Sequence, residues 1–161
     1  LGNLSQRVLS MIFKNCDGVM PALPATPTDD DQAMLDAADA LLPAVRSAID
    51  MQAFHEALRL IWQVVADANR YVDTTAPWGL KKTDPKRMEE VLAVLAECIR
   101  QVAILAQPVM PQATALMLDQ LGVAAESRDF TALGGAARLS SGHKIEKPVP
   151  VFPRYVVEEG Q

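Results

Sequence analysis

The sequence predicts an all-α fold: an antiparallel helical bundle of about five helices with an extended, short-strand tail at the C-terminus. Two observations lead to this prediction. Apolar residues recur at steps of three and four over long stretches, which is the spacing of one helix face. No stretch before residue 143 alternates apolar and polar residues as a half-buried strand does. With 161 residues, half of them apolar, the chain is long enough for one domain with a substantial core.

The first helix is expected over residues 1–16. Its apolar stripe comprises Leu1, Leu4, Val8 and Ile12. Asp17 and Gly18 can leave the right-handed helical region at low steric cost and should end this helix. Since the stripe is already in phase at the first residue, with no capping residue or initiator methionine before it, we expect the chain to be a piece of a longer protein.

A connector with three prolines, residues 21–27, leads into the second predicted helix. Thr28 followed by three aspartates is typical of a helix start, because the hydroxyl caps free N–H groups and carboxylates favour the positive end of the helix dipole. This helix should run to about Ile49. Pro43 lies inside it and removes a backbone donor, so a kink or a break is expected there.

The strongest helical signal lies in residues 51–74, which should form a core helix packed lengthwise in the bundle. Its apolar stripe comprises Phe54, Leu58, Ile61, Val65, Ala68 and Val72. Trp62 borders this stripe and is therefore expected in the core.

Two more helices complete the predicted bundle. Asp84 and Pro85 begin the fourth as a cap and a first-turn proline, and its apolar period continues until Pro108 stops it. The fifth is expected over about 111–121, with Gly122 at its C-terminal cap. Residues 134–161 are rich in Gly, Ser, Pro and Val, so short strands and an extended tail are expected there.

Charge and composition exclude several classes of function. Fifteen basic and twenty acidic residues give a net charge of −5, which argues against a surface that attracts nucleic acid as a whole but permits a local basic patch. No apolar run approaches the roughly 18 residues of a membrane span, and no secretory signal is evident. We therefore expect a cytoplasmic protein with neither a membrane nor DNA as its partner.

The cysteines and histidines do not suggest a metal site. Cys16 and Cys98 are far apart and belong to no C-x-x-C motif, and His55 and His143 are the only further soft ligands in the sequence. No metal is therefore expected, and both thiols should be buried or half-buried in a reducing compartment.

No catalytic residue and no cofactor are expected in this chain. The sequence lacks a glycine-rich phosphate loop, a G-x-S-x-G elbow and a pair of metal-spaced histidines. His55 could act as a general base, but a surface histidine is the more common case. The aspartates 29–31 have an ordinary electrostatic role at a helix start.

Two features suggest a binding site instead. One polar helix face is formed by residues at steps of four, three and four: Asn3, Arg7, Ser10 and Lys14. The second feature is Trp78, in a proline-punctuated loop followed by the basic residues Lys81, Lys82, Lys86 and Arg87.

Together these features would suit an unstacked base. An exposed indole stacks on a base for roughly 1–3 kcal/mol, while Asn and Arg side chains hydrogen-bond base edges and phosphates. The simpler alternatives are a solvated helix face and a tryptophan folded back onto the bundle as a lid on the core. Spacing alone does not establish that the two features meet.

Three motifs, in this order, span nearly the whole chain. They are Leu1-Gly2-Asn3-Leu4-Ser5-Gln6-Arg7, then Ala68-Asn69-Arg70-Tyr71-Val72-Asp73 leading to Ala76-Pro77-Trp78, and finally Pro148-Val149-Pro150-Val151-Phe152-Pro153-Arg154. In these motifs the chain resembles the C-terminal anticodon-binding domain of bacterial methionyl-tRNA synthetase, a class I aminoacyl-tRNA synthetase. The resemblance implies that the bundle reads the CAU anticodon of tRNA(Met). It also implies a separate catalytic domain, absent from this chain, that uses ATP with Mg to attach methionine, so this fragment alone should be inactive.

By motif position, the resemblance implies that Asn3, Arg7 and Trp78 contact the anticodon, chiefly its first base, cytosine. Asp73 would penalise a base that presents an acceptor where cytosine presents an amino group. The anticodon-binding residues expected are Asn3, Arg7, Trp78, Pro77, Asn69 and Asp73, with Lys14, Lys81 and Lys82 as contacts to the RNA backbone.

The resemblance also divides the chain into a helical bundle over residues 1–142 and an extended segment, 143–161, that packs back toward the catalytic domain. Two alternatives stay open. A helical protein-interaction domain should expose a sizeable apolar patch. The equivalent domain of another class I synthetase, for leucine, isoleucine, valine or cysteine, would bind a different anticodon.

Overall fold

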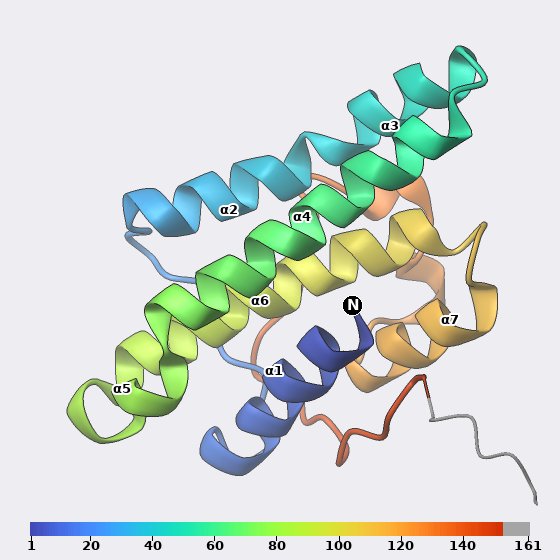
Figure 1. The fold of residues 1–161 in the computed structure, drawn as a ribbon. Coiled ribbons are helices and arrows are strands. Elements are labelled where there is room, and N and C mark those ends of the chain that lie inside the picture. Colours follow the sequence, from blue (N-terminus) through green and yellow to red (C-terminus); the bar gives the residue numbers. More distant parts are fainter. Residues whose placement is uncertain (153–161) are drawn as a thin grey trace, which may run out of the picture.

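The computed structural model describes residues 1–152, and over these residues the chain is a helical bundle, as predicted (Figure 1). The helices are α1 (Gly2–Asn15), α2 (Asp29–Asp39), α3 (Leu41–Asp50), α4 (Phe54–Thr75), α5 (Pro77–Thr83), α6 (Pro85–Ala106) and α7 (Pro111–Gln120), followed by the 3-10 turns Ala125–Ser127 and Phe130–Ala132. Within residues 134–152 the expected short strands are reduced to an isolated bridge between Val19 and Lys144. No helix in the described part of the chain is long and apolar enough to cross a membrane.

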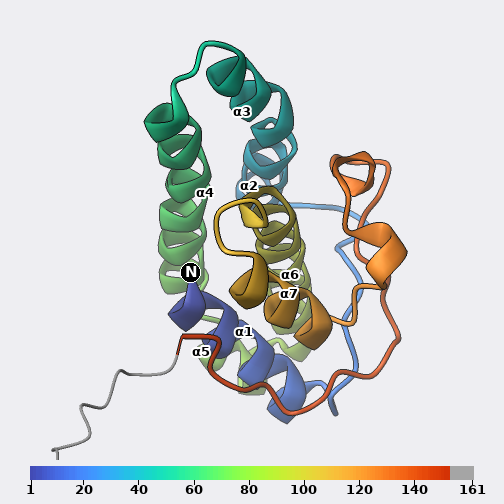
Figure 2. The same ribbon diagram turned by 90° about the vertical axis from the view of Figure 1, so that its right-hand side faces the viewer.

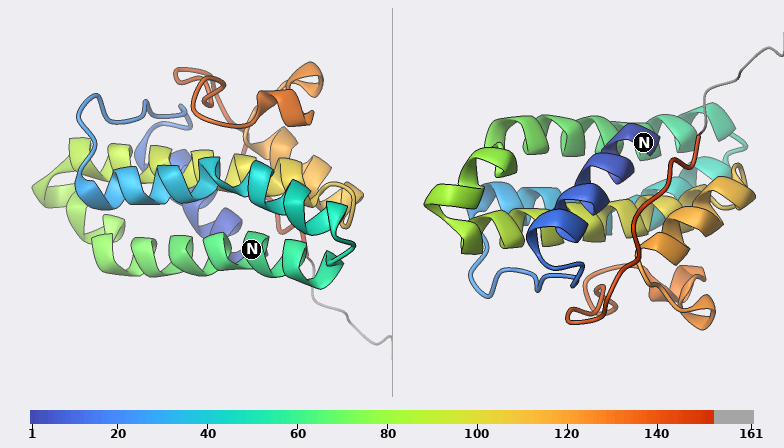
Figure 3. Two further views of the ribbon diagram at one scale, coloured as in Figure 1. Left: turned by 90° about the horizontal axis from the view of Figure 1, so that it is seen from above. Right: turned by 90° about the horizontal axis from the view of Figure 1, so that it is seen from below.

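Helix α6 forms the centre of the core. Every residue from Val91 to Ala106 is buried, as expected for a helix that is covered on all sides. Helices α1, α2, α4, α5 and α7 all pack against it. Figures 2 and 3 show α2, α4 and α6 running along the long axis of the bundle, with α1 lying across them.

The break expected inside the second predicted helix lies at Ala40, between α2 and α3, rather than at Pro43 itself. A proline ring collides with the carbonyl four residues before it, which here belongs to Asp39, the last residue of α2. Pro43 then lies in the first turn of α3, where an N–H group would have no partner within the helix. The proline therefore ends one helix and fits the start of the next.

Helix α4 confirms the long helix predicted from periodicity, but the two ends of its stripe differ. The later residues of this apolar stripe, from Ile61 onward, are buried, whereas the Phe54 side chain is 61% exposed and that of Leu58 is 36% exposed. The prediction that Trp62 lies in the core is wrong, because its side chain is 43% exposed. Trp62 directly follows buried Ile61 and so points about 100° further around the helix, beyond the buried face.

The segment predicted as a loop around Trp78 is the short helix α5. Ala76 ends α4 in the left-handed conformation, at φ 43°, while its N–H still donates to Val72 O over 3.1 Å. Pro77 then begins α5, and the Asp84 side chain caps α6. A proline such as Pro77 suits the first position of a helix as well as a loop, so the residue type alone did not indicate α5.

A buried ionic cluster fixes the chain after α7 to the core. Glu97 is fully buried and accepts hydrogen bonds from Arg100, at 2.9 and 2.7 Å, and from the Leu139 N–H at 2.8 Å. Arg138 donates to both carboxylate oxygens of Asp39, at 2.7 Å each. Residues 130–140 therefore gain their fixed position from side-chain contacts, since they contain little regular structure.

The segment from residue 143 to residue 152 lies against α1 and α7 (Figure 2). Gln6 donates to Pro148 O at 3.4 Å, and Gln120 exchanges two hydrogen bonds with the backbone of Val149. Pro153 and Arg154, the end of the third motif, lie outside the described residues. That this segment also contacts another domain stays a prediction.

Gly122 has the predicted role at the end of α7, with φ at +71°. A Cβ at this position would lie 2.6 Å from the ring of His143, which is itself hydrogen-bonded to Leu121 O. We expect Gly122→Ala to lower the free energy of unfolding by about 1–3 kcal/mol, measured by urea denaturation. Gly79→Ala is the control, because no atom lies within 4 Å of its added Cβ and its φ is not positive. Equal unfolding midpoints for the two variants would contradict this expectation.

Candidate nucleic-acid interface

Side chains from three helices meet at the end of the bundle that carries α5. Arg7 of α1 donates from Nη2 to Oδ1 of Asp73 on α4, over 3.1 Å. Its guanidinium carbon lies over the ring of Trp78 on α5, 5.6 Å from the ring centre. The two sequence features singled out above are therefore joined in one cluster, Arg7–Asp73–Trp78, which we call the Arg7 cluster.

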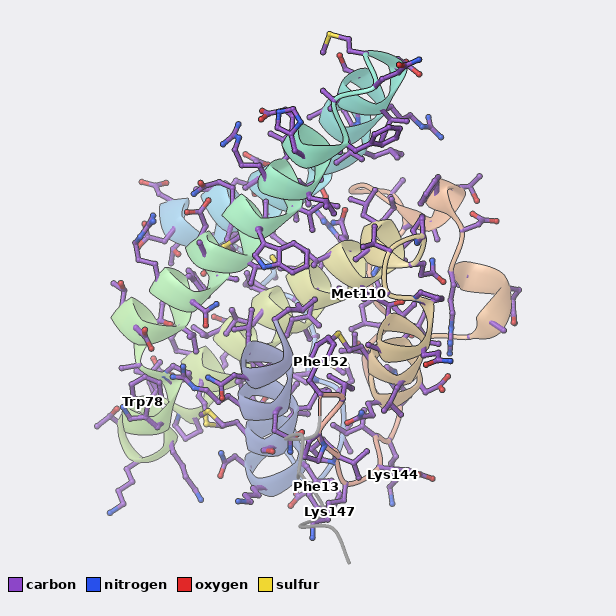
Figure 4. All side chains as sticks on the ribbon, turned by 45° about the vertical axis from the view of Figure 1, so that its right-hand side comes forward. Phe13, Trp78, Met110, Lys144, Lys147 and Phe152 are labelled. Carbon is purple, nitrogen blue, oxygen red and sulfur yellow. The ribbon has the colours of Figure 1, made fainter. Side chains whose placement is uncertain are left out.

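Trp78 is exposed rather than folded onto the core. Its side chain is 52% exposed, and Figure 4 shows it at the surface of the bundle. Arg7 covers one face of the indole in a cation–π contact. The exposed part of the ring is available for stacking on a flat group from outside.

The remaining residues expected to bind the anticodon lie around the Arg7 cluster in different environments. Asn3 is exposed, one helical turn before Arg7. Asn69 lies one turn before Asp73 and is half-buried. It donates from Nδ2 to Val65 O over 2.8 Å, so one of its two amide N–H donors is already engaged. Pro77 is buried, which suits a supporting role beneath Trp78.

The basic residues singled out on α1, α5 and α6 differ in how far their charges are neutralised by acidic partners. Lys81 and Lys82 are exposed in the last turn of α5, and Lys14 is exposed in the last turn of α1. Arg87, included above in the basic run, forms an ion pair with Asp31 at 2.7 Å, so its charge is balanced within the protein. The local positive potential therefore comes chiefly from the lysines.

Ala76 gives the Arg7 cluster its sharp backbone turn. A left-handed conformation is unfavourable for alanine, and such strain is common at functional sites. Because α4 passes into α5 through this one residue, Asp73 and Trp78 lie on consecutive helices near the same turn. Position 76 is an alanine, whereas a left-handed residue at a helix end is usually glycine or asparagine. The residue type therefore did not indicate this conformation.

The carboxylate of Asp31, at the start of α2, is buried, which its place among three helix-start aspartates did not indicate. Asp31 is 0% exposed and accepts hydrogen bonds from Tyr71 Oη at 2.5 Å and from Arg87 Nη1 at 2.7 Å. Thr28 and Asp31 form a capping box, and the T-x-x-D spacing was the one signal that distinguished Asp31 from its two aspartate neighbours.

The environment of Asp31 predicts a loss of stability in acid. Burial by itself raises the pKa of this carboxyl. Hydrogen bonds from Arg87 and Tyr71 outweigh that effect and lower the pKa to about 2. A lowered folded-state pKa stabilises the protein above pH 4, and this contribution is lost as the pH falls to 2. We expect Asp31→Asn to remove about 2 kcal/mol of this pH dependence in urea unfolding between pH 4 and pH 2. A wild-type pH dependence in the variant would contradict the assignment.

A second exposed surface is an apolar groove at the opposite end of α4. Exposed residues lining it are Ile49, Phe54, Leu58, Val109 and Phe130. The 22 residues of α4 span about 33 Å, so this groove is well separated from Trp78. The exposed apolar patch expected of a protein-interaction domain is thus present, apart from the Arg7 cluster.

Comparison with known proteins gives consistent matches. Residues 21–160 match the family described as the anticodon binding domain of methionyl tRNA ligase. The methionine–tRNA ligase of Rhizobium meliloti is 52% identical over 99% of this chain, and that of Brucella suis is 50% identical over all of it. The chain spans 31% of the length of either relative.

Solved structures agree with the sequence matches. The apo Mycobacterium tuberculosis methionyl-tRNA synthetase is 44% identical to this chain and superposes with a TM-score of 0.92. The match covers 98% of this chain and 32% of that one. A second structure of the M. tuberculosis enzyme, with a TM-score of 0.91, holds methionyl-adenylate.

Proposed function

Because the chain belongs to the family of anticodon-binding domains of methionyl-tRNA ligases, we propose that its Arg7 cluster reads the CAU anticodon of tRNA(Met), chiefly the first base. The observation that carries this proposal is the meeting of Arg7, Asp73 and half-exposed Trp78 on three helices. The cluster offers a stacking surface, a cation and a carboxylate within one base-sized area, which is what recognition of an unstacked base needs.

Each side chain has a distinct role in this proposal. The exposed face of Trp78 stacks on the cytosine, a contact worth about 1–3 kcal/mol. Arg7 has five N–H donors, of which one contacts Asp73, and the others can donate to the ring nitrogen and carbonyl oxygen of cytosine. Asn3, exposed one turn away, supplies a further amide for the base or its neighbour.

Asp73 provides the discrimination. Its carboxylate can accept a hydrogen bond from the exocyclic amino group of cytosine, whereas uracil presents an oxygen at the same position. Two acceptors facing each other repel, so a uracil at the first position is penalised. Lys14, Lys81 and Lys82 supply attraction for the phosphates that does not depend on sequence.

The rest of the function belongs to the part of the ligase that this chain does not contain. We assign to it the use of ATP with Mg to attach methionine to tRNA(Met), in the cytoplasm where the tRNA is charged. The methionyl-adenylate held by the M. tuberculosis relative supports this assignment. Residues 143–161 are proposed to extend from the bundle, residues 1–142, toward that catalytic domain.

The alternatives are less well supported. The relatives named above are methionine ligases, at up to 52% identity, which favours CAU over the anticodons read by other class I synthetases. The apolar groove is compatible with a protein contact, but it lies away from the residues that we propose to contact the anticodon.

We expect Asp73→Asn to reduce discrimination at the first anticodon base. The binding preference for a CAU stem-loop over a UAU stem-loop should fall about fivefold or more, because an amide can also donate to the uracil oxygen. Fluorescence anisotropy with labelled RNA at fixed salt measures both affinities. Asp67→Asn is the control, since it removes the same charge from α4 one to two turns away, where Asp67 pairs with Arg70. An equal change for both RNAs in Asp73→Asn would indicate a general electrostatic effect and contradict the proposed role.

A further inference from the structure

Helix α5 packs chiefly against α6, the helix that follows it in the chain. It has seven residues, and helices this short are not stable in isolation. Pro77 is buried and Leu80 packs against the core, but Trp78 and Gly79 are exposed, and no atom lies within 4 Å of a Cβ added at Gly79. The direction of Trp78 therefore depends on the helices that precede and follow α5.

The two helix ends that flank α5 meet on one carboxylate. Tyr71 lies one turn before the end of α4, and its hydroxyl donates to Asp31 Oδ1 over 2.5 Å. Arg87 lies in the first turn of α6 and donates to both carboxylate oxygens of Asp31, at 2.7 Å each. Asp31, at the start of α2, thus bridges the end of α4 to the start of α6.

This bridge is well defined because Asp31 is fully hydrogen-bonded. The backbone N–H of Thr28 donates to its Oδ2 over 3.0 Å, which makes four hydrogen bonds to a carboxylate that is 0% exposed. A buried carboxylate with its acceptor sites filled has one favourable arrangement, and removing a partner leaves a buried charge unpaired. Asp31 therefore holds the end of α4 and the start of α6 together, near the two points that α5 connects.

We infer that Asp31, Tyr71 and Arg87 form a clamp that positions Trp78 against Arg7, so that these three are positioning residues for anticodon reading. The inference rests on the function proposed above. Asp73 lies two residues after Tyr71 on α4, and Trp78 lies on α5, which joins Tyr71 and Arg87 along the chain. Loosening the clamp changes the distance between the indole and the Asp73 carboxylate without removing any group that touches RNA.

The test compares Asp31→Asn and Tyr71→Phe with Asp39→Asn in the full chain. Asp39 is a matched control, because it lies on the same helix α2 and is paired with Arg138, at the opposite end from Asp31. All three variants are studied at a temperature where circular dichroism shows them folded. Tyr71→Phe removes one hydroxyl and leaves the Asp31–Arg87 ion pair in place, so it remains informative if Asp31→Asn does not fold.

The first readout needs no RNA. In a Trp62→Phe background, the indole N–H resonance and iodide quenching report on Trp78 alone, since the chain has two tryptophans. Both clamp variants should shift the resonance and raise the quenching, and Asp39→Asn should do neither. The second readout is affinity for a CAU stem-loop, which should fall about fivefold or more in Asp31→Asn and about threefold in Tyr71→Phe, and stay within twofold in Asp39→Asn.

The outcomes separate the clamp from the proposed function. Clamp variants that keep the wild-type Trp78 signal, or that change the signal without changing the affinity, overturn the inference. An affinity loss of the same size in Asp39→Asn also overturns it, because the effect would then follow from stability alone. A wild-type protein without preference for CAU overturns the proposed function instead, while the Trp78 signal still decides whether the clamp positions α5.

Discussion

Replacing Trp78 by alanine is expected to weaken binding of a CAU stem-loop by about 5- to 150-fold, the range that corresponds to 1–3 kcal/mol for one stacked base. The indole is 52% exposed and is the aromatic group of the Arg7 cluster. Its loss also removes the surface over which the Arg7 guanidinium lies, so the cation is held by Asp73 alone. Anisotropy of a labelled stem-loop, at one fixed low salt concentration, measures the change.

The chain contains a matched control for this experiment. Trp62 is the other tryptophan, is 43% exposed, and lies on α4 away from the Arg7 cluster. Trp62→Ala removes a similar exposed ring and should leave the affinity within twofold. If the two alanine variants bind the stem-loop equally well, Trp78 is not the stacking surface.

Replacing Glu97 by alanine should lower the free energy of unfolding by about 3–5 kcal/mol. This is the cost of removing one partner of a buried ion pair and leaving the other charge unpaired. Arg100 is 3% exposed and would lose its two hydrogen bonds to Glu97. The Leu139 N–H would lose its acceptor, and the segment fixed to α6 by this contact would loosen. Since domains of this kind are stable by about 5–15 kcal/mol in total, the change should be evident in both thermal and urea unfolding.

Glu89→Ala is the control for that loss. Glu89 is an exposed carboxylate on the same helix, and its removal should change stability by less than about 0.5 kcal/mol. Limited proteolysis adds a local readout, because residues 130–140 should become more readily cleaved in Glu97→Ala than in Glu89→Ala. Similar unfolding midpoints for both variants would contradict the role given to the buried cluster.

Most of the fold could be predicted because its main helices carry strong local signals. The Thr28 capping box, the Asp84-Pro85 start and Gly122 at the end of α7 all have the roles that their residue types indicate. The failures occur where local signals are ambiguous. Pro77 can end a helix or begin one, and Trp62 lies at the edge of a stripe, where its size does not decide whether it faces the core.

The candidate site was only partly accessible from sequence. Motif positions indicated Arg7, Asp73 and Trp78, but spacing could not show that α1 crosses the bundle where α4 passes into α5. Asp31 and Arg87 looked like an ordinary helix-start acid and an exposed base. Their pairing is a tertiary contact between α2 and α6, so no local pattern around either residue reveals it.

The measurement that tests the central claim most directly compares the binding of this chain to two stem-loops, one with CAU and one with the first base changed to uracil. The comparison is repeated with Trp78→Ala. We predict at least a tenfold preference of the wild-type chain for CAU, largely lost in the variant. Equal binding of both RNAs by the wild-type chain, with no effect of the substitution, would show that the Arg7 cluster does not read the anticodon and that any binding is phosphate attraction alone.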